Sequence, residues 1–286
     1  MTPVAVLLAA AAAAGGLMTA AGGGTQAPGD ADAHDIAVRL AKWGPRPAAS
    51  APEARAQRLV ARVFRRASLR VTVQDFAVPG LGRSRNVIGE YDGPRSCLHI
   101  VMAHSDTTPG APGANDNASG VGVLAELADG LPGYDKRCDV WLVATGAEER
   151  IYTGSPDHLG ALALARRVKR GPYVRRLRWA LSLDEVGRDR PFWLRSPVAS
   201  PRRSVEGALL GAARRAGVPV SWVRDESTGN SDHREFGLLG LPAAKLGVGA
   251  AGEPCRHMPC DRARRLDPAS LRLARRLVAE ALRLPG

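Results

Sequence analysis

Apolar residues follow two spacings along the chain, and from residue 97 onward these alternate between strand and helix. Near-continuous apolar runs over Cys97–Ala103, Val140–Thr145 and Trp179–Leu183 predict strands that are covered on both faces. Between these runs, apolar positions three and four residues apart predict helices at Ala118–Leu131 and His158–Lys169. Strands and helices that alternate in this way predict an α/β fold, with a mostly parallel central sheet between helical layers.

The flanking segments extend this sheet at its edges. Alternation over Leu69–Val78 and Asn86–Tyr91 predicts two hairpin-like strands, which would add antiparallel edges. The sequence Ser50-Ala51-Pro52-Glu53 is a capping box that predicts the start of a helix. We expect one domain over residues 32–286. Its other predicted elements are helices at Asp35–Trp43 and Ser204–Ala216, strands at Pro219–Val223 and Pro242–Leu246, and a closing helix begun by Asp267-Pro268.

Residues 1–31 are interpreted as a signal peptide and linker. Val4–Ala21 is almost purely apolar and rich in Ala, and a Gly/Thr/Gln/Pro-rich stretch follows. This pattern is typical of a secretory signal with a small-residue cleavage site near Ala20 or Ala21, although no Lys or Arg precedes the run. Two adjacent glycines interrupt the weakly hydrophobic run, so we expect no stable membrane span. We therefore predict a secreted, extracellular protein.

The four cysteines agree with export, because an even number of cysteines in an exported chain predicts two disulfides. Three pairings are possible. We expect Cys255–Cys260, whose members bracket His257, and Cys97–Cys138, whose members each open a predicted buried strand. Buried free thiols are the alternative. A cysteine zinc site is disfavoured, because neither C-x2-C nor clustered Cys/His spacing is present.

The net charge of +12 raises the question of a nucleic-acid partner. The basic residues are nearly all Arg and are spread along the predicted helices. They form no run interleaved with aromatic residues and match no nucleic-acid-binding module. We therefore expect no nucleic acid, and interpret the charge as an Arg-rich composition on solvated helix faces. Attraction to anionic cell-surface polymers is the alternative interpretation.

A set of residues that zinc enzymes favour stands where predicted strands run out into loops. Its members are His104, Asp116, Glu149, Asp184 and His257. Two imidazoles and three carboxylates form a mixed N/O ligand set that suits zinc, although cobalt or manganese would also be accepted. In open α/β sheets, ligands bind outside the carboxyl ends of the strands, so residues from separate strands would meet at one rim.

This ligand set is sufficient for two zinc ions that share one carboxylate. A zinc pair about 3.5–4 Å apart needs a bridging carboxylate, and Asp116, in a Gly-rich loop, is the best candidate. One ion would take His104 and Asp184, and the other would take Glu149 and His257. Each of these signals is weak when taken singly, since a lone Asp in a Gly-rich loop is more often a turn residue.

Two more acids and the remaining histidines complete the candidate site. Asp106, two residues beyond His104, is suited to accept the second N–H of that imidazole and fix its tautomer. Glu148 would take a proton from water and return it to the leaving amine. Of the other histidines, His99 is expected in the core and His34 and His158 at the surface, while His233 is either a partner of the ligand shell or a helix start.

These segments resemble the M28 family of co-catalytic zinc peptidases, whose best-known members are secreted bacterial aminopeptidases. The resemblance covers roughly Asn86 to Leu282 and rests on A-H-S-D, N-D-N-A-S-G, E-E followed by Gly154-Ser155, L-D-E-V-G, S-D-H-x-x-F and H-x-x-x-D. It implies the ligand roles given above, with Glu148 as general base. It also implies a three-layer α/β/α fold with a mixed eight-stranded sheet, and a cis peptide bond between Asp116 and Asn117.

The chain departs from the family pattern at three positions near the site. Arg256 stands where some members carry a Tyr that can stabilise an oxyanion, and Arg could do similar electrostatic work. Glu185 stands where Met is common, close to the expected position of a substrate's free amine, so an added acid fits recognition of a cationic N-terminus. Ile151 replaces the usual Gly after the Glu-Glu pair. These differences put the specificity in doubt more than the activity.

The function predicted from the sequence is that of a monomeric, secreted di-zinc exopeptidase that removes N-terminal residues from peptides. The first alternative is glutaminyl cyclisation on the same fold, which uses one zinc ion; the complete second set of ligands argues against it. The second alternative is a non-catalytic binding relative. Such relatives typically lose ligands or the base, whereas here all are present.

Overall fold

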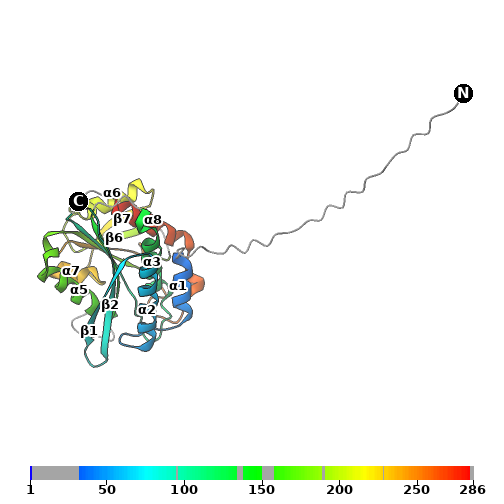
Figure 1. The fold of residues 1–286 in the computed structure, drawn as a ribbon, viewed down its shortest axis with the longest axis horizontal. Helices are drawn as coiled ribbons and strands as arrows, with labels where there is room; N and C mark the ends of the chain where they lie inside the picture. The colour runs from blue at the N-terminus through cyan, green and yellow to red at the C-terminus, as the bar shows by residue number, and fades with distance from the viewer. Residues whose placement is uncertain are drawn as a thin grey trace.

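The computed structural model describes Met1 and residues 32–94, 96–133, 138–149, 158–188, 191–227 and 229–283. One mixed eight-stranded sheet runs through the centre, in the order β1-β2-β4-β3-β5-β8-β6-β7, and helices cover both of its faces (Figure 1). The predicted three-layer α/β/α architecture is therefore confirmed. The predicted signal peptide lies, apart from Met1, outside the described residues.

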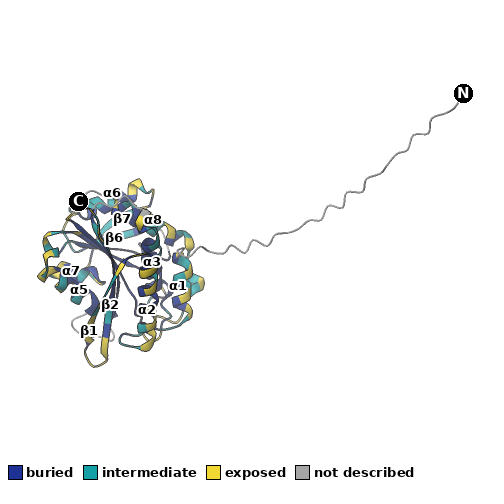
Figure 2. Ribbon diagram, viewed as in Figure 1, coloured by how far each residue is buried: buried dark blue, intermediate teal, exposed yellow. Residues whose placement is uncertain are grey.

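Four parallel strands form the middle of the sheet. They are β4 (Asp139–Thr145), β3 (Leu98–His104), β5 (Leu177–Asp184) and β8 (Ala243–Gly247), which pair in this order. Nearly all of their residues are buried, because helices cover the sheet on both sides (Figure 2). Parallel strands end at the same edge, so their carboxyl ends together form one rim of the sheet.

Antiparallel pairs extend the sheet on both sides. β1 (Arg70–Val78) and β2 (Gly82–Tyr91) form a hairpin that joins β4 through β2, as the alternating pattern predicted. On the other side, β6 (Phe192–Ser196) pairs antiparallel with β8 and parallel with β7 (Val220–Arg224). The sequence interpretation missed β6. It is only five residues long and its burial alternates, so it lacks the long apolar run of the central strands.

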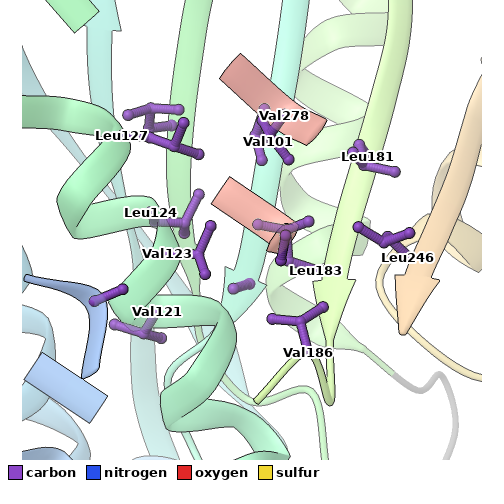
Figure 3. Close-up of a cluster of buried hydrophobic side chains, with 14 of the residues drawn as sticks. Val101, Val121, Val123, Leu124, Leu127, Leu181, Leu183, Val186, Leu246 and Val278 are labelled. Atoms are coloured by element: carbon purple, nitrogen blue, oxygen red, sulfur yellow. The ribbon is translucent and has the colours of Figure 1, made fainter. Parts of the chain in front are cut away.

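Among the described residues, five helices form the layer on one face of the sheet and enclose the larger part of the core. α3 lies directly on β3, β4 and β5, while α8 packs on α3 and α6. Figure 3 shows Val121 and Leu124 of α3 beside Val101, Leu181 and Leu183 of the strands. These helices are α1 (Ala33–Lys42), α2 (Ala51–Arg66), α3 (Ser119–Gly130), α6 (Glu206–Arg215) and α8 (Pro268–Leu282).

Two helices, α5 (Leu159–Arg170) and α7 (His233–Leu238), cover the opposite face. Successive residues of a strand point to opposite faces, so Ile100 and Met102 of β3 belong to this second apolar cluster, whereas Val101 belongs to the first. This double burial fixes the register of β3 and leaves its carboxyl end as the place where the chain can present polar groups.

Two disulfides connect loops at the ends of the sheet. Cys97–Cys138 joins the residue before β3 to the residue before β4, and Cys255–Cys260 closes a short loop, so both predicted pairs are confirmed. The peptide bond between Asp116 and Asn117 is cis, as the family resemblance implied. Short helical turns lie at Ala114–Ala118, Leu131–Gly133, Pro172–Arg175 and Ala263–Arg265. Within the described residues, no helix has the length and apolar content needed to cross a membrane.

Candidate metal centre

The candidate ligands meet at the rim formed by the carboxyl ends of the central strands. His104 and Asp184 are the last residues of β3 and β5, which pair in parallel, so both side chains are brought to the same edge. Glu149 follows four residues after the end of β4. All three side chains are buried, although they are polar. The sequence placed these residues at strand ends, and the structure brings them together as expected.

The carboxylate of Asp116 lies between the two histidines. Its Oδ1 is 3.2 Å from Nε2 of His104, and its Oδ2 is 3.3 Å from Nε2 of His257. The two other acids stand on either side, because Asp184 Oδ1 is 3.6 Å from His104 Nε2, and Glu149 Oε2 is 3.0 Å from His257 Nε2. The five side chains thus form two neighbouring groups that share Asp116.

The spacing and the chemistry of these groups fit a pair of metal ions. Two ligands that each lie about 2.1 Å from a tetrahedral zinc ion are about 3.4 Å apart, which is close to the separations within both groups. Asp184 Oδ1 and Glu149 Oε1 are buried and have no hydrogen-bond partner among the described residues. A buried carboxylate oxygen without a partner is costly unless a proton or a cation satisfies it.

The electrostatics also favour a cation at this rim. Burial alone would lower the pKa of His104, but the surrounding carboxylates, Glu148 first among them, raise it well above its usual value. Burial and the neighbouring Asp116 raise the pKa of Glu149 to about 7. Both shifts have the same origin, because several acids share a buried space and each disfavours negative charge on the next. Positive ions bound there would relieve this repulsion.

Hydrogen bonds hold the backbone of Asp116 in place. Asp261 accepts from the backbone N–H of Asn115 at 2.8 Å and of Asp116 at 3.0 Å. Asn117 donates from its side chain to the carbonyl of Leu183 at 2.7 Å, which ties this loop to the end of β5. Gly120 completes the loop, because a Cβ there would lie 2.5 Å from the same carbonyl oxygen. The acid that ends H-x-x-x-D thus supports Asp116.

Asp106 accepts from the His104 imidazole, as the sequence predicted, but it does so through its backbone carbonyl. The imidazole Nδ1 of His104 is 3.2 Å from the backbone carbonyl of Asp106, which makes that carbonyl its hydrogen-bond acceptor, whereas the Asp106 carboxylate is 3.7 Å away. The carboxylate instead accepts from the backbone N–H of Glu148 and of Glu149. Its lone pairs are taken up by these amides. Asp106 therefore orients the histidine through its main chain and the two glutamates through its side chain.

Glu148 lies beside the ligands and is held by a histidine that the sequence interpretation placed wrongly. His158 was expected at the surface, but it is buried and its Nε2 is 3.4 Å from Glu148 Oε1. Its Nδ1 is 3.3 Å from Glu235 Oε1, so the ring bridges two acids. Burial, together with the charges of Glu149 and other nearby acids, raises the pKa of Glu148 well above its usual value. Glu148 is therefore suited to hold a proton.

The predicted capping box is only half formed, and its acid serves the site. Ser50 accepts from the backbone N–H of Glu53 at 3.2 Å, as predicted for an N-cap. Glu53 does not complete the box by accepting from Ser50; its carboxylate accepts from the backbone N–H of Ala49 at 2.7 Å and of Ala147 at 3.1 Å. Ala147 has a left-handed backbone (φ 50) just before Glu148. A residue of α2 thus fixes the turn that presents the glutamate pair.

Three charged residues form a wall of the pocket beside Asp184. Lys245 of β8 places its Nζ 2.8 Å from Asp184 Oδ2 and 3.9 Å from Glu185 Oε2. Arg256 binds Glu185 with two N–H groups, including Nε at 2.7 Å from Oε1. Burial alone would lower the pKa of Lys245, but Asp184 and Glu185 raise it above its usual value. The sequence interpretation missed Lys245.

This wall changes two of the sequence predictions. Glu185 was expected to bind the free amine of a substrate, but Arg256 and Lys245 already face its carboxylate. Arg256 was considered for stabilising an oxyanion, and it is held by Glu185. The whole pocket has a volume of about 160 Å³. It is lined by Asp116, Glu148, Glu149, His158, Asp184, Glu185, Asn230, Lys245, Arg256 and His257.

The remaining predicted residues lie away from this pocket or beyond the described chain. His233 is the first residue of α7, and its Nε2 is 2.6 Å from Asp225 Oδ2; it is not among the residues that line the pocket. His99 is buried in the core as predicted, stacked on Trp179. His34 is half-buried on α1. Ile151, the third departure from the family pattern, lies outside the described residues.

The fold and the site together define an α/β protein with a candidate metal centre at the carboxyl ends of parallel strands. A model of peptidase family M28 matches residues 86–282, and the chain belongs to this family. Among curated relatives, aminopeptidase YwaD of Bacillus subtilis (strain 168) is 39% identical over 90 residues, or 29% of this chain and 20% of YwaD. The uncharacterized protein YfbL of Escherichia coli (strain K12) is 35% identical over 127 residues, or 41% of this chain and 38% of YfbL. The chain thus matches well under half the length of either relative.

Solved structures of two kinds of enzyme share this fold. The zinc aminopeptidase BSAP from Bacillus subtilis superimposes with a TM-score of 0.76 at 19% identity, over 89% of this chain and 94% of that chain. Bacteroides thetaiotaomicron glutaminyl cyclase bound to N-acetylhistamine superimposes with a TM-score of 0.74 at 21% identity, over 91% of this chain and 99% of that chain. At these identities the likeness shows the fold, and the fold is common to both activities.

Proposed function

We propose that this chain is a di-zinc aminopeptidase. The proposal rests on the position of Asp116, whose two carboxylate oxygens face two different histidines at 3.2 Å and 3.3 Å. In this proposal His104 and Asp184 would hold one ion, Glu149 and His257 would hold the other, and Asp116 would be available to both. Bound zinc would supply Lewis acidity, which polarises a carbonyl group and makes water more acidic.

The protein's own residues supply proton transfer and orientation. Glu148 takes a proton from the attacking water and delivers it to the amine that leaves, and its position beside the ligands, with Oε2 3.9 Å from His104 Nε2, suits both steps. His158, together with the Asp106 carboxylate that accepts from the backbone N–H of Glu148, keeps the Glu148 carboxylate pointed into the pocket.

Export is part of the proposal. We propose that residues 1–31 are a secretory signal and linker, that residues 32–286 are the mature domain, and that this domain acts outside the cell as a monomer. The two disulfides support this location, because disulfides persist in oxidising compartments. Mass spectrometry of the protein recovered from the culture medium would test it, and a mass that retains residues 1–31 would contradict it.

The activity is tested with purified protein, aminoacyl-anilides and a zinc chelator. We expect two zinc equivalents by elemental analysis, and hydrolysis that the chelator abolishes and added zinc restores. The alternative is glutaminyl cyclisation, because a glutaminyl cyclase has the same fold. Conversion of an N-terminal glutaminyl peptide to a cyclic product, with one zinc equivalent and no anilide hydrolysis, would establish that alternative. Two bound zinc ions with neither reaction would instead indicate a binding protein.

A further inference from the structure

A charged wall stands beside the candidate metal centre. Glu185 follows directly after β5, Lys245 is on β8, which pairs with β5, and Arg256 precedes His257 in the disulfide-closed loop. Glu185 and Lys245 are buried, and the side chain of Arg256 is 38% exposed. The wall therefore extends from the buried ligands to the mouth of the pocket. It carries two cations and one carboxylate.

Charge balance is the simplest explanation of this wall. Lys245 would neutralise Asp184, and Arg256 would neutralise Glu185. Charge balance leaves two observations unexplained. Asp184 also belongs to the proposed ligand set, with Oδ1 3.6 Å from His104 Nε2, so its charge would be shared with a bound metal ion. Among the described residues, both cations also keep spare donors, because an ammonium group has three N–H bonds and a guanidinium group has five, while Arg256 gives two to Glu185.

Metal binding would change the charge balance between Lys245 and the acids around it. Metal ions held by Asp184 would take up its negative charge, and the Lys245 ammonium would then face the pocket with Glu185, at 3.9 Å, as the remaining acid. That acid is already bound by two N–H groups of Arg256. A buried ammonium group needs a close counter-charge, and an apolar substrate group would supply none. A carboxylate of the substrate would supply it.

We propose that the wall formed by Lys245, Glu185 and Arg256 selects peptides that carry a carboxylate next to the bond to be cleaved. This inference rests on the proposed aminopeptidase function and assigns its substrate class. The carboxylate has two possible sources, the side chain of an N-terminal Asp or Glu and the C-terminus of a dipeptide. Lys245 is the principal contact, and Arg256 adds its free N–H groups at the mouth. Glu185 positions both cations.

Matched substrates separate the two sources of the carboxylate. Asp-anilide and Asn-anilide differ in side-chain charge and hardly in size, and Leu-Gly and Leu-Gly-amide differ in the C-terminal charge. We expect the zinc-loaded protein to favour the charged member of one pair at least about tenfold in kcat/KM, the scale of a charge-assisted hydrogen bond. Preference in the first pair identifies the side chain, and preference in the second identifies the dipeptide terminus.

Variants connect the preference to the wall. Lys245→Met should remove most of the preference and bring the ratio within each pair close to one, Lys245→Arg should retain most of it, and Arg256→Met should reduce it less. Lys42→Met, at an exposed position of α1, is the matched control and should change nothing. Zinc content is measured for every variant. If Lys245→Met loses zinc, the substrate preference is compared between the original protein, Lys245→Arg and Arg256→Met instead.

The outcomes keep the two proposals apart. If anilides are hydrolysed and neither matched pair differs by more than about twofold, the carboxylate proposal is wrong and the aminopeptidase proposal stands. If no substrate is cleaved, the aminopeptidase proposal fails. Calorimetric titration with aspartic acid α-amide and asparagine amide then decides whether the wall recognises a carboxylate. If the original protein and Lys245→Met bind aspartic acid α-amide with equal affinity, Lys245 does not recognise the carboxylate.

Discussion

The carboxylate of Asp106 accepts hydrogen bonds from the backbone N–H of Glu148, with its two oxygens at 3.1 Å and 3.0 Å. It also accepts from the backbone N–H of Glu149 at 3.1 Å. A side chain next to β3 thus fixes the backbone that presents both the proposed base and a proposed ligand. Because Asp106 is buried, its contacts are shielded from water.

Replacing this carboxylate should disturb both glutamates at once. In Asp106→Asn, an amide NH₂ group would face a backbone N–H, so one acceptor is lost and a donor opposes a donor. We expect kcat to fall by about 10- to 100-fold, as for residues that orient metal ligands, and the free energy of unfolding to fall by about 1–3 kcal/mol. Kinetics and urea denaturation measure both. An unchanged kcat would show that other contacts hold Glu148.

Substitution of Glu148 should separate chemistry from metal binding. Glu148→Gln keeps the size of the side chain and removes its capacity to carry a proton in the reaction. We expect unchanged zinc content and a kcat at least about 10²-fold lower. Glu280→Gln, a partly exposed position on α8, is the matched control. Near-normal turnover in Glu148→Gln would assign the proton transfer to another group.

His257 should be required for binding one of the two proposed zinc ions. Its imidazole is 46% exposed, and it faces Glu149 at 3.0 Å and Asp116 at 3.3 Å. His257→Ala should lower the zinc content from two equivalents to one, because Asp116 and Glu149 alone leave that ion with too few ligands. His34→Ala, on α1, controls for the loss of a histidine. Two equivalents in His257→Ala would remove this residue from the ligand set.

The disulfide around His257 should contribute to the same site. Cys255 and Cys260 close a loop of sequence separation 5 that carries this histidine, whose backbone is left-handed (φ 60). Opening the loop releases a conformation that the chain does not favour by itself. The double substitution Cys255→Ala/Cys260→Ala should therefore weaken binding of the ion at His257 by about tenfold or more, measured by competition with a chelator. Unchanged affinity would mean that neighbouring contacts are sufficient.

The sequence predicted the central sheet because β3, β4 and β5 are buried on both faces and so read as unbroken apolar runs. The short strand β6 has no such run. The order and spacing of the polar motifs likewise predicted which acids and histidines meet at the rim. Spacing cannot specify which atoms make contact, however. Asp106 accepts from His104 through its backbone carbonyl, and the contacts of its carboxylate with the amides of Glu148 and Glu149 were not predicted.

Lys245 and His158 are two of the pocket residues that the sequence interpretation did not place there, and the reasons differ. Lys245 interrupts the apolar run of β8, and a charged residue within a predicted buried strand is a signal that the sequence offered. His158 offered no comparable signal. It stands just before α5, a position where histidines are commonly solvated, and its burial depends on the packing of Glu148 and Glu235 around it. Such long-range contacts arise from the tertiary fold.

The buried His99 should make the protein sensitive to acid. Its ring stacks on Trp179 at 4.2 Å between centroids, and its Nδ1 has no hydrogen-bond partner among the described residues. Burial, reinforced by the charge of Arg178, lowers its pKa from 6.5 to about 3. The folded protein therefore keeps this ring neutral in a range of pH where the unfolded chain protonates it.

The sign of the effect follows from proton linkage. Below pH 6.5 the unfolded state binds a proton that the folded state does not. The free energy of unfolding therefore decreases as the pH is lowered from 6.5 to about 3. At pH 5 the loss from this one group is about 2 kcal/mol. His99→Phe keeps the stacked ring and cannot titrate. The difference in unfolding free energy between pH 7 and pH 5 should therefore shrink by about 2 kcal/mol in urea denaturation. His34→Phe, at a half-buried position outside the sheet, reports the effect of replacing a histidine by itself. Equal pH dependence in the original protein and in His99→Phe would show that the buried ring does not resist protonation.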